Sequence, residues 1–249
     1  ELFTIGELDR VWVIADVFEM DLPRVKKSAE VQVRVLAYPD DRFSGDLRDA
    51  ELTNSVARDA RELMRAESSE NRTYGDVQVF IETFAPKPKL IILGGVHTAI
   101  PLTQFAQALG FHVTIVDGRG RFATRERFPT ADNIIVAWPD EAIAQLMINS
   151  STYIAILTHD PKFDIPALKA LSSTHPRYIG AMGSRETRKQ HFAELRVAGV
   201  SDEFLESVHG PIGLDLGART PEEMALAIMA EILAVRYGKP GGFLSESDK

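Results

Sequence analysis

The chain has 249 residues, 45% of them hydrophobic, which is enough to bury one large core or two smaller ones. Its 36 aspartates and glutamates outnumber 28 lysines and arginines and give a formal net charge of −8. This balance argues against nucleic acid or an anionic membrane as the main partner. The absence of cysteine excludes disulfides, thiolate metal sites and a cysteine nucleophile.

Residues 1–46 have the composition of β-structure. Segments 11–18 and 31–38 are rich in valine and isoleucine, and the second alternates apolar with polar residues. The pattern then changes, because residues 47–68 place leucine, valine and methionine mainly at helical spacing. A further strand is predicted over 77–84.

The sequence APKPK at residues 85–89 predicts a stiff linker, because proline fixes its own φ and extends the residue before it. Beyond it, apolar strands alternate with helices, which predicts an α/β, Rossmann-like parallel sheet with helices on both faces. The predicted strands are 90–93, 112–117, 133–138, 152–157 and 177–183. The predicted helices are 98–109, 140–147, 164–172, 185–198 and one from Pro221 to about Tyr237. A capping box of Thr220 and Glu223 marks the start of the last helix.

The turn after the first of these strands, Gly94-Gly95-Val96-His97, has features of a nucleotide-binding turn. Glycine lets the backbone approach a phosphate, and an acid that closes the next strand, here Asp117, binds a ribose hydroxyl in dinucleotide sites. The fingerprint is incomplete, since Val96 stands where the middle glycine makes room for pyrophosphate. The turn is either an NAD(P) site or an ordinary strand–turn–helix connection, with His97 as a neutral polar group in the first helical turn.

Polar residues also follow the strand predicted at 152–157, namely Thr158, His159, Asp160 and Asp164. In open parallel sheets, ligands bind beyond the carboxyl ends of the strands. The histidine and the two aspartates could instead hold a metal ion, and either aspartate could simply cap the next helix.

A third group lies at the start of the helix predicted at 185–198. Gly183, Ser184, Arg185 and Arg188 combine small residues, a helix N-terminus and arginines, which together suit an anionic ligand such as phosphate. The alternative is a solvated basic face. Asp215 follows in a glycine-containing loop, where it could face the same strand edge or belong to a shaped connection.

Several blocks in this order resemble the C-terminal domain of the XdhC/CoxI family, the accessory proteins of xanthine dehydrogenase and related molybdenum hydroxylases. They are LIILGGVHTA, GFHVTIVDGRGRFATRERFPTAD, YIAILTHDPKFD, YIGAMGSRETRK and PIGLDLGARTPEEMALAIMAEI. The resemblance implies a Rossmann-like domain over 89–249 that binds the molybdenum cofactor (molybdopterin) as cargo. It further implies delivery of that cargo to an apo molybdenum hydroxylase of the xanthine dehydrogenase type.

The same resemblance implies a cytoplasmic maturation factor rather than a turnover enzyme. A cysteine desulfurase is a further candidate partner and a homodimer a candidate state, whereas neither nucleic acid nor a membrane is expected. No catalytic or metal-ligating residue is assigned. The candidate cofactor-binding residues are Gly94, Gly95, His97, Asp117, Arg119, Thr158, His159, Asp160, Asp164, Gly183, Ser184, Arg185 and Asp215.

The chain departs from the family at Val96, where a glycine is usual, and in lacking the cysteine that the family's N-terminal domain commonly carries. Residues 47–88 resemble only the end of that domain and the linker after it. Residues 1–46 are instead similar to a barrel segment of periplasmic efflux adaptors (membrane fusion proteins). Two alternatives to the cofactor chaperone therefore stay open, an NAD(P)-binding oxidoreductase and an efflux-adaptor fusion fragment.

Overall fold

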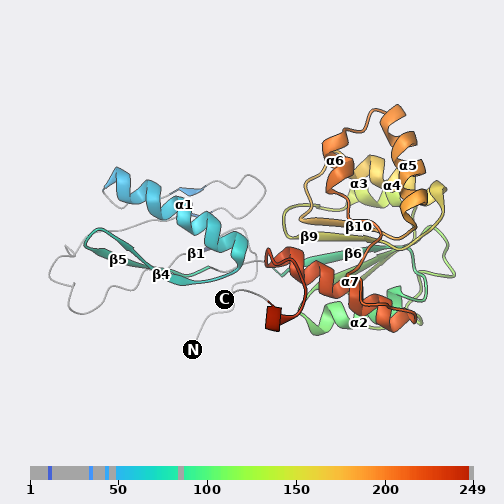
Figure 1. Cartoon of the computed structure of the whole chain (residues 1–249), viewed down its shortest axis with the longest axis horizontal. Coiled ribbons are helices and arrows are strands. Elements are labelled where there is room, and N and C mark those ends of the chain that lie inside the picture. Colours follow the sequence, from blue (N-terminus) through green and yellow to red (C-terminus); the bar gives the residue numbers. More distant parts are fainter. Residues whose placement is uncertain (1–10, 13–33, 36–42, 45–48, 84–86, 247–249) are drawn as a thin grey trace. The chain divides into compact units, whose positions relative to one another are not determined.

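The chain divides into two compact units, Glu1–Pro86 and Lys87–Lys249, in the computed structural model (Figure 1). The residues that the structure describes are 11–12, 34–35, 43–44, 49–83 and 87–246. The division into segments 1–46, 47–88 and 89–249 stays a prediction.

The first unit contains a small antiparallel sheet. Its two-residue strands are β1 (Val11–Trp12), β2 (Arg34–Val35) and β3 (Phe43–Ser44), paired in that order. A β-rich segment before the α/β domain was expected and is confirmed. Most of the strands predicted over 11–18 and 31–38 lies outside the described residues.

The helix predicted near residue 50 is α1 (Ala50–Ala66), which starts at Asp49, whose carboxylate accepts the N–H groups of Glu51 and Leu52. It packs on a hairpin of β4 (Glu70–Tyr74) and β5 (Val77–Ile81). The phenol of Tyr74 also donates to Asp59 of the helix at 2.7 Å. Strand β4 has no counterpart in the sequence prediction because its residues, ENRTY, are polar and half of the hairpin faces solvent.

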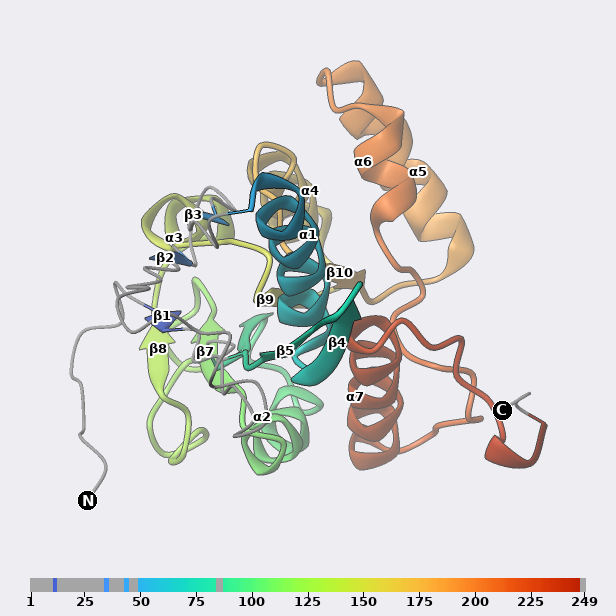
Figure 2. The same cartoon turned by 90° about the vertical axis from the view of Figure 1, so that its left-hand side faces the viewer.

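The second unit is built on a five-stranded parallel sheet, as predicted. Its strands are β6 (Lys89–Leu93), β7 (His112–Val116), β8 (Asn133–Ile135), β9 (Thr152–Ile156) and β10 (Tyr178–Ala181). Their spatial order is β10-β9-β6-β7-β8, so β8 and β10 form the edges (Figure 2). The chain therefore reverses direction across the sheet between β6 and β9, and ligands bind at such switch points in open α/β sheets.

Helices cover both faces of this sheet. One face carries α2 (Ala99–Ala108) and α7 (Pro221–Arg236), and the other carries α3 (Pro139–Gln145), α4 (Pro161–Leu171), α5 (Arg185–Val197) and α6 (Asp202–Ser207) (Figure 1). A 3-10 turn, η2 (Leu244–Glu246), follows α7. None of the helices in the described part of the chain has the length and apolar character needed to cross a membrane.

The central strand β6 contributes side chains to the hydrophobic cores on both faces of the sheet. Leu90 and Ile92 pack with α2 and α7, while Ile91 and Leu93 pack with α3 and α4. Successive side chains of a strand point to opposite faces, so a strand covered on both sides must be apolar throughout. This continuous apolar character made the sheet recognisable from the sequence.

The loop between α6 and α7 is fastened to the edge of the sheet. His209 exchanges backbone hydrogen bonds with Ile179 and Ala181, so the chain runs beside β10 there. The carboxylate of Glu231 on α7 accepts from the phenol of Tyr178 and lies 3.1 Å from Nδ1 of His209. These contacts hold the neighbouring residue Gly210 near the carboxyl end of β10.

Helix α7 begins with the capping box that the sequence predicts. Thr220 Oγ1 accepts the N–H of Glu223 at 3.2 Å, and the Glu223 carboxylate accepts the N–H of Thr220 at 3.0 Å. Two N–H groups without intrahelical partners are thereby satisfied.

Replacing the cap residue, Thr220→Ala, is expected to lower the free energy of unfolding by about 1 kcal/mol, because one backbone donor loses its acceptor. Urea denaturation followed by circular dichroism measures the change. Thr130→Ala, which removes an exposed threonine outside the helices, serves as control and should cost less than about 0.5 kcal/mol. Equal losses in the two variants would contradict a capping role.

Candidate functional site

The turns that follow β6 and β9 meet at the carboxyl edge of the sheet. Gly94 has a φ of +109°, and a Cβ built on it would lie 2.7 Å from Cγ2 of Thr158. No other residue fits this close approach without displacing a neighbour. The glycine therefore brings these two turns into direct contact at the switch point.

The second glycine of the turn also makes room for the chain itself. A Cβ on Gly95 would lie 2.6 Å from the carbonyl oxygen of Phe122, and the Gly95 N–H donates to Asp117 at 2.9 Å. The half-buried side chain of Val96 packs against the core that α2 and α7 share. In a dinucleotide site the backbone of this turn faces pyrophosphate, whereas here it faces Phe122 and Asp117.

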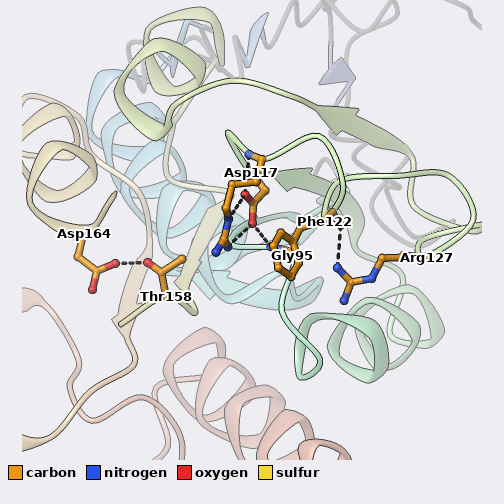
Figure 3. A network of polar contacts seen from close by, with 7 residues as sticks. Gly95, Asp117, Phe122, Arg127, Thr158 and Asp164 are labelled. Atoms are coloured by element: carbon orange, nitrogen blue, oxygen red, sulfur yellow. Dashed lines mark hydrogen bonds and ion pairs between the residues drawn. The ribbon is translucent and has the colours of Figure 1, made fainter. Parts of the chain in front are cut away.

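The Asp117 side chain is fully buried, and both of its carboxylate oxygens accept hydrogen bonds from the chain (Figure 3). It accepts from the N–H of Gly95, and from the N–H, Nε and Nη2 of Arg119 at 2.8–2.9 Å. Burial pushes the pKa of Asp117 up, but the Arg119 guanidinium and the two backbone donors outweigh it, so the pKa lies below its usual value. A carboxylate offers about four lone-pair sites, and four donors of the chain already use them. The acid that motivates the NAD(P) alternative thus has its acceptors engaged by Arg119 and Gly95.

Aromatic side chains that the sequence reasoning missed surround Arg119. Its guanidinium lies 4.1 Å from the ring centroid of Phe122 and 5.2 Å from that of Phe163. The ring of Trp138 stacks on Phe163, with centroids 4.5 Å apart. Arg127 donates to the carbonyl oxygen of Phe122 and secures the same loop (Figure 3). The sequence could have indicated two of these residues by their position, since Trp138 ends one predicted strand and Phe163 follows another, which places both near the carboxyl edge of the sheet.

The polar residues after β9 take separate roles. Asp160 caps α4 by accepting the N–H of Lys162 at 3.0 Å, which is the capping alternative for that residue. Asp164 is only 3% exposed, and the hydroxyl of Thr158 donates to its Oδ1 (Figure 3). Burial raises the pKa of Asp164, and the Thr158 hydrogen bond opposes the rise only in part. His159 is exposed.

The third candidate group lies at the N-terminus of α5. Ser184 caps the helix by accepting the N–H of Thr187 at 3.0 Å, and Gly183 before it has a φ of +136°. Arg185 is exposed in the first turn. Arg188, also expected at an anion site, instead donates to the carbonyl oxygens of Gly210 and Val208 at 2.7 and 2.9 Å.

The remaining candidates lie apart from these contacts. His97 is exposed and precedes α2, which begins at Ala99, so it lies before the helix rather than in its first turn. Asp215 is exposed in the loop before α7. Among the described residues, no group of three or more histidines and acids is arranged to hold a metal ion.

A parallel sheet of this order, covered by helices on both faces and with polar turns at its carboxyl edge, defines a Rossmann-like α/β domain. The family model of the XdhC Rossmann domain matches residues 90–232, which is more than half of the chain. The chain therefore belongs to the XdhC family. A second family model, the CusB-like β-barrel domain, matches residues 10–69.

Curated relatives support the same assignment. The chain is 30% identical over 171 residues to the uncharacterized protein YqeB of Escherichia coli, covering 68% of this chain and 31% of that protein. It is 30% identical to a probable xanthine dehydrogenase subunit of Bacillus subtilis, covering 64% and 46%. It is 28% identical to the molybdenum cofactor insertion chaperone PaoD of E. coli, covering 68% and 46%. The chain thus spans less than half the length of each.

A solved structure extends the similarity to three dimensions. A protein described as a xanthine dehydrogenase from Bacillus halodurans superposes with a TM-score of 0.60 at 25% identity. The match covers 85% of this chain and 59% of the other.

Proposed function

We propose that this chain binds the molybdenum cofactor and delivers it to a molybdenum hydroxylase of the xanthine dehydrogenase type. Membership of the XdhC family and the similarity to a cofactor insertion chaperone support the proposal. The observation that carries it is the carboxyl edge of the sheet at β9 and β10. There, a polar turn and the N-terminus of α5 converge, whereas the turn after β6 is filled by the chain itself.

The chemistry of this edge matches the phosphate of molybdopterin. The first N–H groups of a helix lack intrahelical acceptors, and the helix dipole favours negative charge at the same end. Arg185 adds an exposed guanidinium in that turn, and Gly183 keeps the approach free of a side chain, since a Cβ there would meet nothing nearer than 3.8 Å. Ser184 is the cap of the same helix, and the exposed residues His159 and Asp160 belong to the turn after β9, the strand that pairs with β10.

The role is binding and transfer rather than turnover. An apo hydroxylase is the receiving partner, and a cysteine desulfurase, a homodimer and a cytoplasmic location belong to the same proposal. The CusB-like match over residues 10–69 favours a second candidate function, attachment to an efflux assembly. Co-purification of a pump component with the full chain would support this second function, and no binding at micromolar concentrations would count against it.

Cofactor retention tests the first function. The chain is produced in cells that synthesise the cofactor, and the purified protein is assayed for molybdenum by mass spectrometry and for pterin by fluorescence after oxidation. Arg185→Ala should weaken retention about tenfold or more, because a hydrogen bond to a charged group contributes about 1.5–3 kcal/mol. Lys189→Ala removes an equal charge one turn further along α5 and should retain the wild-type amount.

Two results would count against this site. Wild-type protein that retains neither molybdenum nor pterin would end the cofactor proposal. Equal retention by wild type and Arg185→Ala would remove the arginine from the site. Delivery is measured separately, as the activity that an apo xanthine dehydrogenase gains from the loaded chain compared with free cofactor.

A further inference from the structure

Helix α7 is apolar on the side that faces solvent as well as on the side that packs against the sheet. On the solvent side, Leu226 and Tyr237 are 53% and 54% exposed, and Ala230 and Leu233 are half-buried between them. The charged residue in the middle of the helix, Glu231, points away from this side, because its carboxylate bonds to groups at the sheet edge. A helix that is apolar all round is normally covered on every side, so the outer side of α7 has the character of an interface.

Helix α2 extends this uncharged surface. It packs beside α7 on the same face of the sheet, and its sequence AIPLTQFAQA contains no charged residue (Figures 1 and 2). Leu109, at its end, is 43% exposed. By contrast, α5 on the opposite face reads RETRKQHFAELRV and is rich in charge. The face formed by α2 and α7 is therefore the apolar side of this unit.

The size of this face suits a modest interface. Helix α7 has 16 residues and is about 24 Å long, and packed helix axes lie about 8–10 Å apart, so the face measures about 20 by 24 Å. Two copies that meet through it would remove about 1,000 Å² from solvent in total, which is the lower limit for a specific interface. An association of this size should be reversible on dilution.

The outer stripe of α7 is complementary to itself when the helix is reversed. Glu222, Leu226, Ala230, Leu233 and Tyr237 are spaced by four, four, three and four residues, which keeps them on one side of the helix. Reversal about the centre exchanges Leu226 with Leu233 and Glu222 with Tyr237, and leaves the small side chain of Ala230 near the middle. An interface with a two-fold axis needs this property, because the same patch must fit itself.

The charges at the two ends of α7 fit the same reversal. The first turn carries Glu222 and Glu223, whereas Arg236 and Lys239 lie at the end. In an antiparallel pair, the acidic start of each helix lies beside the basic end of the other. Opposite charges then flank the apolar centre at both ends, which favours a second copy of this chain as the occupant.

We propose that two copies of this chain pair through the outer stripe of α7 in an antiparallel arrangement. Leu226 of one copy packs against Leu233 of the other, twice around the axis, and α2 covers the sides of the contact. The inference deepens the proposed function, since it names the surface of the homodimer that belongs to it.

The pairing leaves both proposed cofactor edges accessible. Arg177, directly before β10, donates to the carbonyl oxygen of Arg236 at 2.5 Å, so α7 ends beside the start of β10 and begins at the carboxyl edge of the sheet. Antiparallel pairing therefore directs the two carboxyl edges toward opposite ends of the dimer. Each phosphate site at α5 lies on the face of the sheet opposite the contact.

Sedimentation velocity of the full chain over a dilution series tests the pairing. Wild type should sediment as a dimer that dissociates on dilution. Leu226→Lys and Leu233→Glu should each raise the dissociation constant about tenfold or more, because each buries two charges without partners at the centre of the contact. Val197→Lys, which changes a residue of α5 that is 91% exposed, should behave as wild type. Circular dichroism checks that each variant is folded.

Mixing the two variants tests the register. A pair made of one Leu226→Lys copy and one Leu233→Glu copy places the lysine against the glutamate at one contact and leaves leucine against leucine at the other. An equimolar mixture should therefore recover the dimer that neither variant forms alone. A binding partner other than a second copy would not show this rescue.

Three results would overturn the inference: wild type that is monomeric up to about 100 μM, a dimer that both variants leave unchanged, or a mixture that stays monomeric. Cofactor retention separates these failures from failure of the proposed function. Wild-type monomer that retains cofactor would reject the α7 pairing and keep the function. Wild-type dimer that is dissociated by both variants and retains no cofactor would keep the pairing and reject the function.

Discussion

Gly94→Ala is expected to destabilise the second unit by about 2 to 6 kcal/mol. About 1–3 kcal/mol comes from placing a side chain at a φ of +109°. A similar amount comes from overpacking, since the new Cβ would lie 2.7 Å from Cγ2 of Thr158. Thr158 donates to Asp164, so the displaced turn should also disturb the edge where the cofactor is proposed to bind. Urea denaturation and cofactor retention report the two effects.

Two further variants separate backbone strain from crowding. Gly110 has a φ of +83° with nothing within 4 Å of a built Cβ, so Gly110→Ala measures the strain alone, about 1 to 2 kcal/mol. Adding Thr158→Ser to Gly94→Ala removes the crowded methyl and keeps the hydroxyl, and should restore part of the stability. If Gly94→Ala costs no more than Gly110→Ala, the close contact between the two turns is not important.

Asp117→Asn is expected to cost about 2 to 4 kcal/mol. The amide replaces an acceptor with a donor among four N–H groups and leaves Arg119 without its ion pair. A fully buried pair costs about 3–5 kcal/mol to break, but the Arg119 side chain is 39% exposed and can still reach water. The control Asp140→Asn changes an exposed acid at a helix start and should cost less than about 1 kcal/mol.

The stabilisation that ionised Asp117 provides should decrease as the pH falls into the acid range. The pKa of Asp117 is lower in the folded chain than its ordinary value of 3.8, so the unfolded chain binds the proton more readily. The stabilisation is therefore complete above about pH 5 and is lost as the pH falls below 4 through the folded pKa. The gap in unfolding free energy between wild type and Asp117→Asn should narrow in acid. A gap that stays constant from pH 7 to pH 3 would exclude the ion pair as its source.

Local pattern was enough for most of the second unit. Continuous apolar strands alternating with helices predicted the parallel sheet, because a strand buried on both faces cannot carry polar residues. The cap of α7 was also predicted from local pattern. Thr220 and Glu223 satisfy backbone N–H groups within a single helical turn, so the residues that form the cap are close together in the sequence. Strand β4 and the short helix α6 were missed because their residues are largely polar. Their secondary structure depends on tertiary contacts, since β4 pairs with β5 and α6 buries Leu205 in the core.

The candidate site depended much more on tertiary structure. Gly94 and Gly95 look like phosphate-binding glycines in the sequence, but the turns containing Thr158 and Phe122 occupy the space beside them. Asp117 looks like a ribose ligand, but Arg119, two residues later, bonds to it through both backbone and side chain.

By itself, the sequence determined the α/β architecture, the family and the edge of the sheet where polar residues collect. Only the tertiary structure decided which of those residues are engaged within the chain and which are exposed. It paired Asp164 of α4 with His191 of α5, 27 positions apart. Periodicity and motifs report on residues that are close together in the sequence. The groups that donate hydrogen bonds to a buried carboxylate can come from distant turns, which meet only when the sheet has formed.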